Sequence, residues 1–222
     1  MCRKLVVFAL ILGLASVSYG AVIGNWEGTN MDNWQATWEA GPATLTPGAT
    51  LGVTLATGSL KVDWVGKYWA VQYNMTGADL AAAVAGQNQF SFDWTAFGSD
   101  FHGDWFAIGK SIVVNSAVGW TQYDAGGGVQ KQYDRNTNLE LSIDDQGAWY
   151  TEMDRTYKAD LSAFNWAGAQ AGGWGQILVS MQANPDGLGL GTIYMDKAQL
   201  TPEPATMALL GLGGLALIRR KR

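Results

Sequence analysis

The sequence has almost no cysteine or histidine. Of its 222 residues one is a cysteine, Cys2, and one is a histidine, His102. Cys2 lies in a leader-like N-terminal segment, so the exported chain would have no disulfide and no thiol nucleophile. A single histidine cannot form a histidine-rich transition-metal site. Because no nucleophile motif accompanies His102, we predict neither a zinc enzyme nor a serine hydrolase.

Basic residues are scarce in the body of the chain. Residues 21–204 keep 8 of the 14 basic residues and all 19 acidic ones, a formal charge of −11. Such an acidic surface repels phosphate backbones, which argues against a nucleic acid as partner. The glycine run at 126–128 lacks the lysine and the Ser/Thr of a phosphate-binding loop. A soluble extracytoplasmic protein is the class that fits this charge balance.

The first 20 residues have the three parts of a secretory signal peptide. Arg3 and Lys4 precede an uncharged apolar stretch, residues 5–17, and the small residues Ser18 and Gly20 follow it. This order predicts export through the Sec translocon and cleavage before Ala21. An apolar stretch of this length is short for a transmembrane helix, which argues against an uncleaved anchor.

The last 22 residues, 201–222, form a second targeting-like segment. A Pro-Glu-Pro tripeptide is followed by an apolar run, residues 205–218, and by four basic residues. As a helix the run would reach about 21 Å, less than the roughly 30 Å of a bilayer core. A basic cluster beside an apolar run holds that end on the cytoplasmic side. We therefore expect a short transmembrane helix at 205–218.

This order of elements resembles the PEP-CTERM sorting signal of Gram-negative bacteria, a tail also found on some ice-binding proteins. The resemblance implies sorting by an exosortase-type membrane transpeptidase, with transient anchoring before release to the cell surface or extracellular matrix. It also implies an association with extracellular polysaccharide or biofilm. The residues that match are Pro202, Glu203, Pro204, Arg219, Arg220, Lys221 and Arg222.

Residues 21–200 read as one β-rich domain. Short segments alternate apolar and polar residues and are bounded by Gly, Asn and Asp, as β-strands of a sandwich are. One Ala-rich segment, residues 77–86, predicts a short helix, and residues 105–115 predict a hairpin that turns near Gly109 and Lys110. The other predicted strands are 60–64, 68–75, 89–97, 139–143, 174–182 and 191–200.

Three segments of the body resemble the jelly-roll carbohydrate-binding modules, which are galactose-binding-like sandwiches. They are the opening NWEGTNMDNW (25–34), the strand GSLKV (58–62) and the closing IYMD (193–196). The resemblance implies a single jelly-roll β-sandwich whose first and last strands lie side by side. It also implies a structural Ca²⁺ bound by Glu27 and Asp196, with a backbone carbonyl near Ser59. Lys197 departs from the pattern, in which an Asn is common after the aspartate.

Tryptophan is abundant, with 11 residues, all of them in the body. Flat indole rings stack on the C–H faces of sugars while neighbouring amides and carboxylates bond the hydroxyls. The alternative is that alternation places these rings in the core of a disulfide-free sandwich. The candidate carbohydrate-binding residues are Trp69, Trp94, Trp105, Trp120, Gln72, Asp93 and Asn115.

We therefore expect an exported, non-catalytic surface or matrix protein that binds extracellular polysaccharide. A purely structural or adhesive matrix protein is the first alternative. A glycan hydrolase would need a facing pair of carboxylates, for which Glu152 and Asp154 are the candidates. Ice binding would need a regular threonine face, whereas the threonines between 44 and 57 are irregularly spaced.

Overall fold

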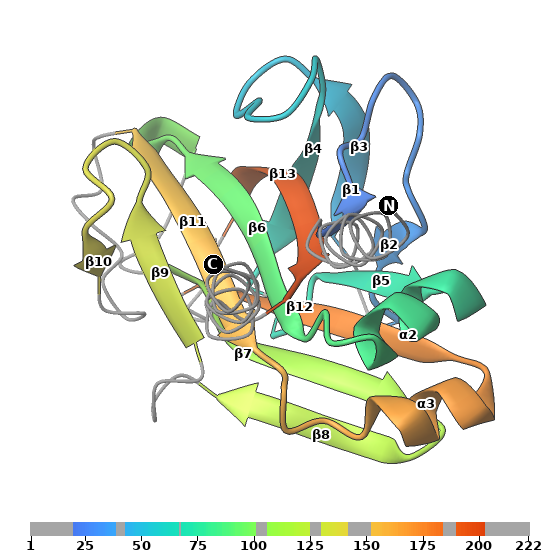
Figure 1. Cartoon of the computed structure of the whole chain (residues 1–222). Helices are drawn as coiled ribbons and strands as arrows, with labels where there is room; N and C mark the ends of the chain where they lie inside the picture. Colours follow the sequence, from blue (N-terminus) through green and yellow to red (C-terminus); the bar gives the residue numbers. More distant parts are fainter. Residues whose placement is uncertain are drawn as a thin grey trace, which may run out of the picture.

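The chain forms two antiparallel β-sheets that pack face to face (Figure 1). The computed structural model describes residues 20–38, 43–66, 68–100, 106–124, 130–141, 152–183 and 190–202. The predicted all-β sandwich is therefore confirmed. The predicted signal peptide up to Tyr19 and the predicted helix 205–218 lie outside these ranges. Within them, no helix is both long enough and apolar enough to span a membrane.

The larger sheet has eight strands, and the last strand of the sandwich lies near its centre. Along it the order is β10-β9-β11-β6-β13-β4-β3, and β1 pairs with β13 beyond the end of β4. The first and last strands thus lie side by side, as the jelly-roll resemblance implies. The bounds are β1 Ala21–Gly24, β3 Thr44–Ala49, β4 Ser59–Val65, β6 Gln89–Ala96, β9 Gln130–Asp134, β10 Glu140–Leu141, β11 Met153–Asp160 and β13 Leu190–Thr201.

The smaller sheet has five strands in the order β2-β5-β12-β7-β8. Its β7 is one continuous strand, so the hairpin predicted at Gly109 and Lys110 is wrong. Gly109 has a φ of +68° and forms a β-bulge there, and the chain turns only after Ser116. The bounds are β2 Trp34–Ala36, β5 Val71–Met75, β7 Phe106–Ser116, β8 Gly119–Asp124 and β12 Gly175–Ala183.

Two short helices pack against each other beside the smaller sheet (Figure 1). Helix α2, Gly77–Val84, confirms the helix predicted at 77–86, and a capping box between Thr76 and Asp79 begins it. Helix α3, Trp166–Gly172, was not predicted. Its N-terminal cap is Asn165, and it ends at Gly173 in the left-handed conformation. A single 3₁₀ turn, η1 at Gly98–Asp100, follows β6.

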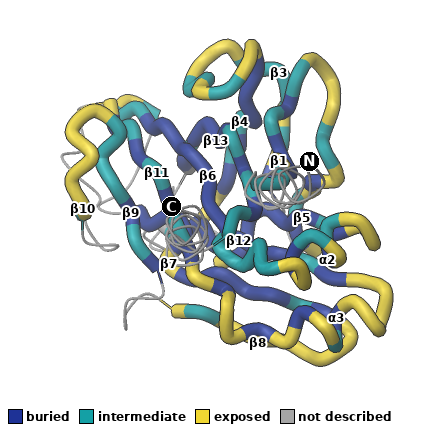
Figure 2. Tube along the Cα trace, in the orientation of Figure 1, coloured by how far each residue is buried: buried dark blue, intermediate teal, exposed yellow. Residues whose placement is uncertain are grey.

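Aromatic rings fill the space between the sheets. In Figure 2, buried residues follow strands of both sheets. Trp34 of the smaller sheet stands 6.3 Å from Phe90 of the larger, measured between ring centroids. Trp94 and Phe106 bridge the sheets in the same way at 6.5 Å. Trp26, which precedes β2, packs edge-on against Trp34 and is fully buried. Many tryptophans are therefore core residues, as the alternative from the sequence proposed.

The loop between β3 and β4, residues 50–58, is fastened to the larger sheet by two carboxylates. Asp196 of β13 accepts hydrogen bonds from the backbone N–H groups of Thr54 and Leu55, each at 2.6 Å. Glu27 accepts from the backbone N–H of Thr57 at 2.8 Å and from the Thr57 hydroxyl. Negative charge thus replaces the strand partners that these loop amides lack.

Replacing Trp34 by alanine tests the importance of the ring contacts between the sheets. Trp34 is 2% exposed, and its Nε1 donates to the carbonyl of Ile23 at 2.8 Å. We expect W34A to lower the free energy of unfolding by about 3–5 kcal/mol in urea titrations followed by circular dichroism. Trp38, which is 70% exposed, provides the matched control. Equal losses in W34A and W38A would contradict this account of the core.

Replacing Glu27 by glutamine tests the fastening of the loop. Hydrogen bonds from the Thr57 hydroxyl, and then from the backbone of Thr57 and Gly58, lower the pKa of Glu27. The carboxylate therefore stabilises the fold above its unfolded pKa, and this contribution is lost as the pH falls through the folded pKa. We expect E27Q to lower the melting temperature at pH 7, and the difference from wild type to shrink at pH 3. The exposed Glu140, replaced as E140Q, should change little at either pH.

Candidate functional site

The outward side of the smaller sheet is rich in amide side chains, and we call it the amide face. Alternate residues of these strands, among them Tyr73 and Ile177, point into the main core, so their neighbours point outward. One row crosses four strands. Strand pairing sets Asn74 opposite Gln176, Gln176 opposite Asn115, and Asn115 opposite Trp120.

Hydrogen bonds link the amides of this row. Asn115 Nδ2 donates to Gln176 Oε1 at 3.2 Å, and Gln176 Nε2 donates to Asn74 Oδ1 at 2.9 Å. Gln72 Nε2 also points to Asn74 Oδ1, at 3.5 Å. Gln176 both accepts and donates in this chain of bonds, so the bonds fix which way its side chain points between Asn115 and Asn74. The row is a preformed set of donors and acceptors on a rigid sheet.

The next row has an apolar centre covered by a tryptophan. In this row Gln72, Leu178, Val113 and Gln122 lie opposite one another in turn. Trp69 packs on Leu178 and Val113 to form a cluster separate from the main core. Trp69 precedes β5 and lies on the opposite side of the sheet from Val71 and Tyr73, which point into the main core.

Two exposed rings lie beside these rows. Trp120 is 44% exposed, and its ring meets that of Trp69 edge-on at 6.0 Å. Tyr68 meets Trp69 at 5.0 Å and is half exposed. Tyr68 was not among the residues predicted from the sequence.

The predicted carbohydrate-binding residues fall into four groups. The structure brings Trp69, Gln72, Asn115 and Trp120 together on the amide face. Trp94 is only 1% exposed and lies in the core, because it shares the inward side of β6 with Phe90 and Phe92. Asp93 lies on the outward side of the larger sheet, away from the amide face. Trp105 lies outside the described residues.

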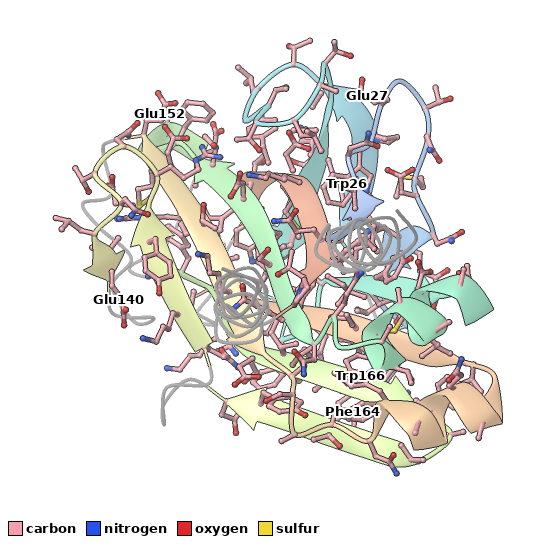
Figure 3. All side chains as sticks on the ribbon, viewed as in Figure 1. Trp26, Glu27, Glu140, Glu152, Phe164 and Trp166 are labelled. Atoms are coloured by element: carbon pink, nitrogen blue, oxygen red, sulfur yellow. The ribbon has the colours of Figure 1, made fainter. Side chains whose placement is uncertain are left out.

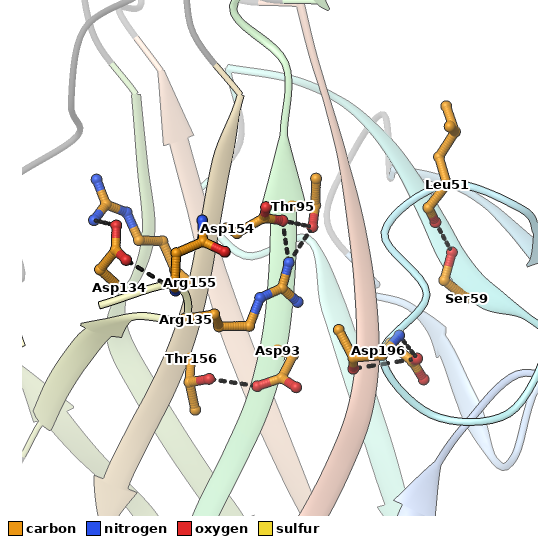
Figure 4. A network of polar contacts seen from close by, with 12 residues as sticks. Leu51, Ser59, Asp93, Thr95, Asp134, Arg135, Asp154, Arg155, Thr156 and Asp196 are labelled. Atoms are coloured by element: carbon orange, nitrogen blue, oxygen red, sulfur yellow. Dashed lines mark hydrogen bonds and ion pairs between the residues drawn. The ribbon is translucent and has the colours of Figure 1, made fainter. Parts of the chain in front are cut away.

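The outward side of the larger sheet holds a network of charged and hydroxyl groups (Figure 4). Arg135 Nη2 donates to the Thr95 hydroxyl at 2.6 Å and forms an ion pair with Asp154. Thr95 also donates to Asp154, at 2.6 Å, and Thr156 donates to Asp93 at 2.6 Å. These short polar contacts tie β6 and β11 to the turn after β9.

The two carboxylates proposed for a hydrolase differ in their surroundings. Asp154 is held by Arg135 and Thr95, so its charge is compensated within the fold. Glu152 is exposed at the start of β11, near the rim of the larger sheet (Figure 3). The ion pair of Asp154 has the character of a structural contact between strands, and a hydrolase stays an alternative that these contacts do not test.

The three residues predicted to bind calcium all contact the β3–β4 loop. Glu27 and Asp196 accept from its backbone N–H groups, and Ser59 Oγ donates to the carbonyl of Leu51 at 2.5 Å. A Ca²⁺ ion would need these carboxylate oxygens to exchange N–H donors for the metal. In the described ranges no three His, Cys, Asp or Glu side chains gather to hold a metal. The calcium site stays a prediction.

A cavity of about 350 Å³ lies apart from the amide face, between β1, β5 and the start of α2. Its carboxylates already have structural partners. Asp32 accepts from the backbone N–H groups of Asn25 and Trp26, and Asp79 accepts from the Tyr73 hydroxyl at 2.5 Å. Burial, and then the bond to Asp79, raise the pKa of Tyr73. Asp32 and Asp79 therefore order the opening loop and cap the helix.

Solved structures similar to this chain include three carbohydrate-binding modules. A CBM28 module specific for non-crystalline cellulose is 10% identical, with a TM-score of 0.45 over 82% of this chain and 94% of its own. A family 11 module of the cellulase Lic26A-Cel5E from Clostridium thermocellum is 15% identical, with a TM-score of 0.44 over 84% and 96%. A xylan-binding CBM22 domain is 14% identical, with a TM-score of 0.32 over 83% and 93%. The function proposed below rests on the residues of this chain.

The C-terminal segment matches a known sorting family. No curated protein matches the sequence. Residues 200–222 match the PEP-CTERM protein-sorting motif, which confirms the resemblance seen in the order Pro-Glu-Pro, apolar run and basic cluster. The motif indicates export and membrane-associated sorting to the cell surface, and it implies processing by an exosortase. The chain thus carries a PEP-CTERM sorting motif that begins within β13, the last strand of its β-sandwich.

Proposed function

We propose that this protein is a non-catalytic surface or matrix protein that binds extracellular polysaccharide through the amide face. The observation that carries the proposal is the hydrogen-bonded row of Asn74, Gln176 and Asn115, which ends at the exposed Trp120. Sugar hydroxyls both donate and accept, and side-chain amides offer both functions at a fixed spacing. A stacking ring beside such a row provides the apolar half of sugar recognition.

Gln72 gives a second, independent support. This side chain is 2% exposed and lies on the amide face beside the row. Within the described part of the chain, its Oε1 is buried and accepts no hydrogen bond. Leaving a buried acceptor without a donor costs about 1–3 kcal/mol. A hydroxyl of a bound glycan would supply that donor only once a neighbouring side chain moves, because this oxygen is not accessible to solvent.

The lack of charged groups in the two rows limits which class of polysaccharide the amide face can bind. The two rows described above contain no ionisable side chain, although residues 21–204 carry a formal charge of −11. An anionic polymer would be repelled by the protein as a whole and would find no basic row to bind it. An uncharged polysaccharide needs only the hydroxyl and ring contacts that the face offers. We therefore expect a neutral glycan.

The sorting motif fits this role. It sends the protein to the cell surface, where polysaccharide is within reach, and the resemblance adds an association with biofilm. The same destination suits the alternative, a structural or adhesive matrix protein without specific glycan binding. The exposed side chain of Trp120 favours binding, because a purely structural surface has no need of a large ring exposed beside an amide row.

Alanine substitutions on the amide face test the proposal. The purified full-length protein would be run through native gels that contain a soluble neutral β-glucan or xylan, with retardation as the measure of affinity. We expect W120A and Q176A each to weaken retardation by about tenfold or more, because the first removes a stacking ring and the second a linked amide.

The control is a ring on the opposite sheet. Tyr133 is partly exposed on the outward side of β9, so Y133A should bind as wild type does. If wild type is not retarded by any neutral polysaccharide while its melting curve shows a folded protein, the structural alternative is favoured. Equal losses in Y133A and W120A would argue against a site on the amide face.

A further inference from the structure

A β-bulge at one end of the amide face lets two consecutive residues line the same cavity. Between the pairs Met181–Ile108 and Val179–Ile112, β12 contributes one residue and β7 contributes three. Gly109 takes up the bulge at a φ of +68°, and a Cβ there would lie 2.7 Å from the Tyr157 ring. Lys110 and Ser111, its next two residues, both line one cavity.

The bulge is secured by hydrogen bonds. The backbone N–H of Ser111, which lacks a regular partner across the bulge, donates to Ser180 Oγ at 2.8 Å. The Ser111 hydroxyl then donates to Asp124 of the neighbouring strand at 2.6 Å. β-Bulges re-aim side chains and are common beside functional sites. Here the bulge turns Lys110 outward next to a fixed carboxylate.

The cavity has a volume of about 200 Å³, and its walls carry opposite charges and one ring. Ser111 and Gln122, each at 2.6 Å, donate to the same oxygen of Asp124. These two bonds, that from Ser111 first, lower the pKa of Asp124, so it stays ionised. Tyr68, which adjoins Trp69, supplies an exposed aromatic wall. The lining residues are Tyr68, Lys110, Ser111, Asp124 and Gln182.

We propose that this cavity holds one uncharged sugar residue of the polysaccharide bound on the amide face, between Lys110 and Asp124. The inference rests on the proposed function and adds the subsite that selects among sugars. A sugar hydroxyl can accept from the ammonium group while its neighbour donates to the carboxylate, and Tyr68 can cover the apolar side of the ring.

The paired charges also decide which sugars are rejected. A uronic acid would bring its carboxylate to Asp124, and an amino sugar would bring its ammonium group to Lys110. Either like-charge contact disfavours binding, whereas a neutral hexose or pentose meets no such repulsion. Removing one of the two charges should therefore change which polysaccharide is bound, and not only how tightly.

Native gels that contain neutral β-glucan, xylan or alginate, a polyuronate, test this subsite with the full-length protein. We expect wild type to be retarded by a neutral polymer and not by alginate. D124N should lose about tenfold or more in affinity for the neutral polymer, as a hydrogen bond to a charged group is removed. It should also gain retardation by alginate, because Lys110 then faces the uronate without the opposing carboxylate. K110M should lose affinity for the neutral polymer and gain none for alginate.

The matched control is Asp63 on the larger sheet, which resembles Asp124 in its contacts. It accepts from the Thr192 hydroxyl at 2.5 Å and pairs with Lys61 at 2.8 Å. D63N should bind all three polymers as wild type does. Melting curves of D124N and K110M show whether each is folded, and Lys110 is exposed enough that K110M retains the sandwich.

The possible results distinguish a failure of the proposed subsite from a failure of the proposed function. If W120A and Q176A lose binding while D124N and K110M keep the wild-type preference, the subsite is overturned and the proposed function stands. If wild type binds none of the polymers, both are overturned. A gain of alginate binding in D124N but not in D63N supports the subsite, because a general loss of structure cannot produce a gain.

Discussion

The stacking of aromatic rings between the two sheets is the constraint on which the rest of the structure depends. Without disulfides, the sandwich is held by contacts such as Trp34 with Phe90 and Trp94 with Phe106. Large rings occupy the inward side of several strands, such as β6 with Phe90, Phe92 and Trp94. The strands alternate, so the outward side of each sheet remains available for polar groups. The positions of the core residues along each strand therefore determine which residues lie on the surface.

The outward sides of the two sheets carry different kinds of polar groups. On the larger sheet, charged groups such as Arg135 and Asp154 pair with each other and with threonines. On the smaller sheet the side chains of Asn74, Gln176 and Asn115 are uncharged and bond along one row. A row of linked amides with exposed rings beside it can exchange bonds with hydroxyls at low cost.

The sequence predicted the fold class and part of the site because both depend on alternation. Phe90, Phe92 and Trp94 share one side of a strand, and that side proved to be the core. The same alternation could have excluded Trp94 as a ligand-binding residue, had the two aromatic neighbours been weighed. Trp69 could not be assigned by alternation, because it lies before β5 and crosses to the other side of the sheet.

Other features were beyond sequence reasoning for physical reasons. Gly109 and Lys110 look like a turn, since glycine tolerates a positive φ, and only tertiary packing shows that the strand continues through a bulge. Likewise Gln176 and Trp120 come from strands that are more than fifty residues apart. Their neighbourhood depends on the strand order β5-β12-β7-β8, which no local pattern encodes.

The sorting motif overlaps the last strand of the sandwich. The motif begins at Leu200, which is still inside β13, paired with Phe90 on one side and Ala21 on the other. The sandwich and the motif therefore share residues, and no spacer separates them along the chain. The start of the motif thus belongs to the larger sheet, whereas the amide face belongs to the smaller one.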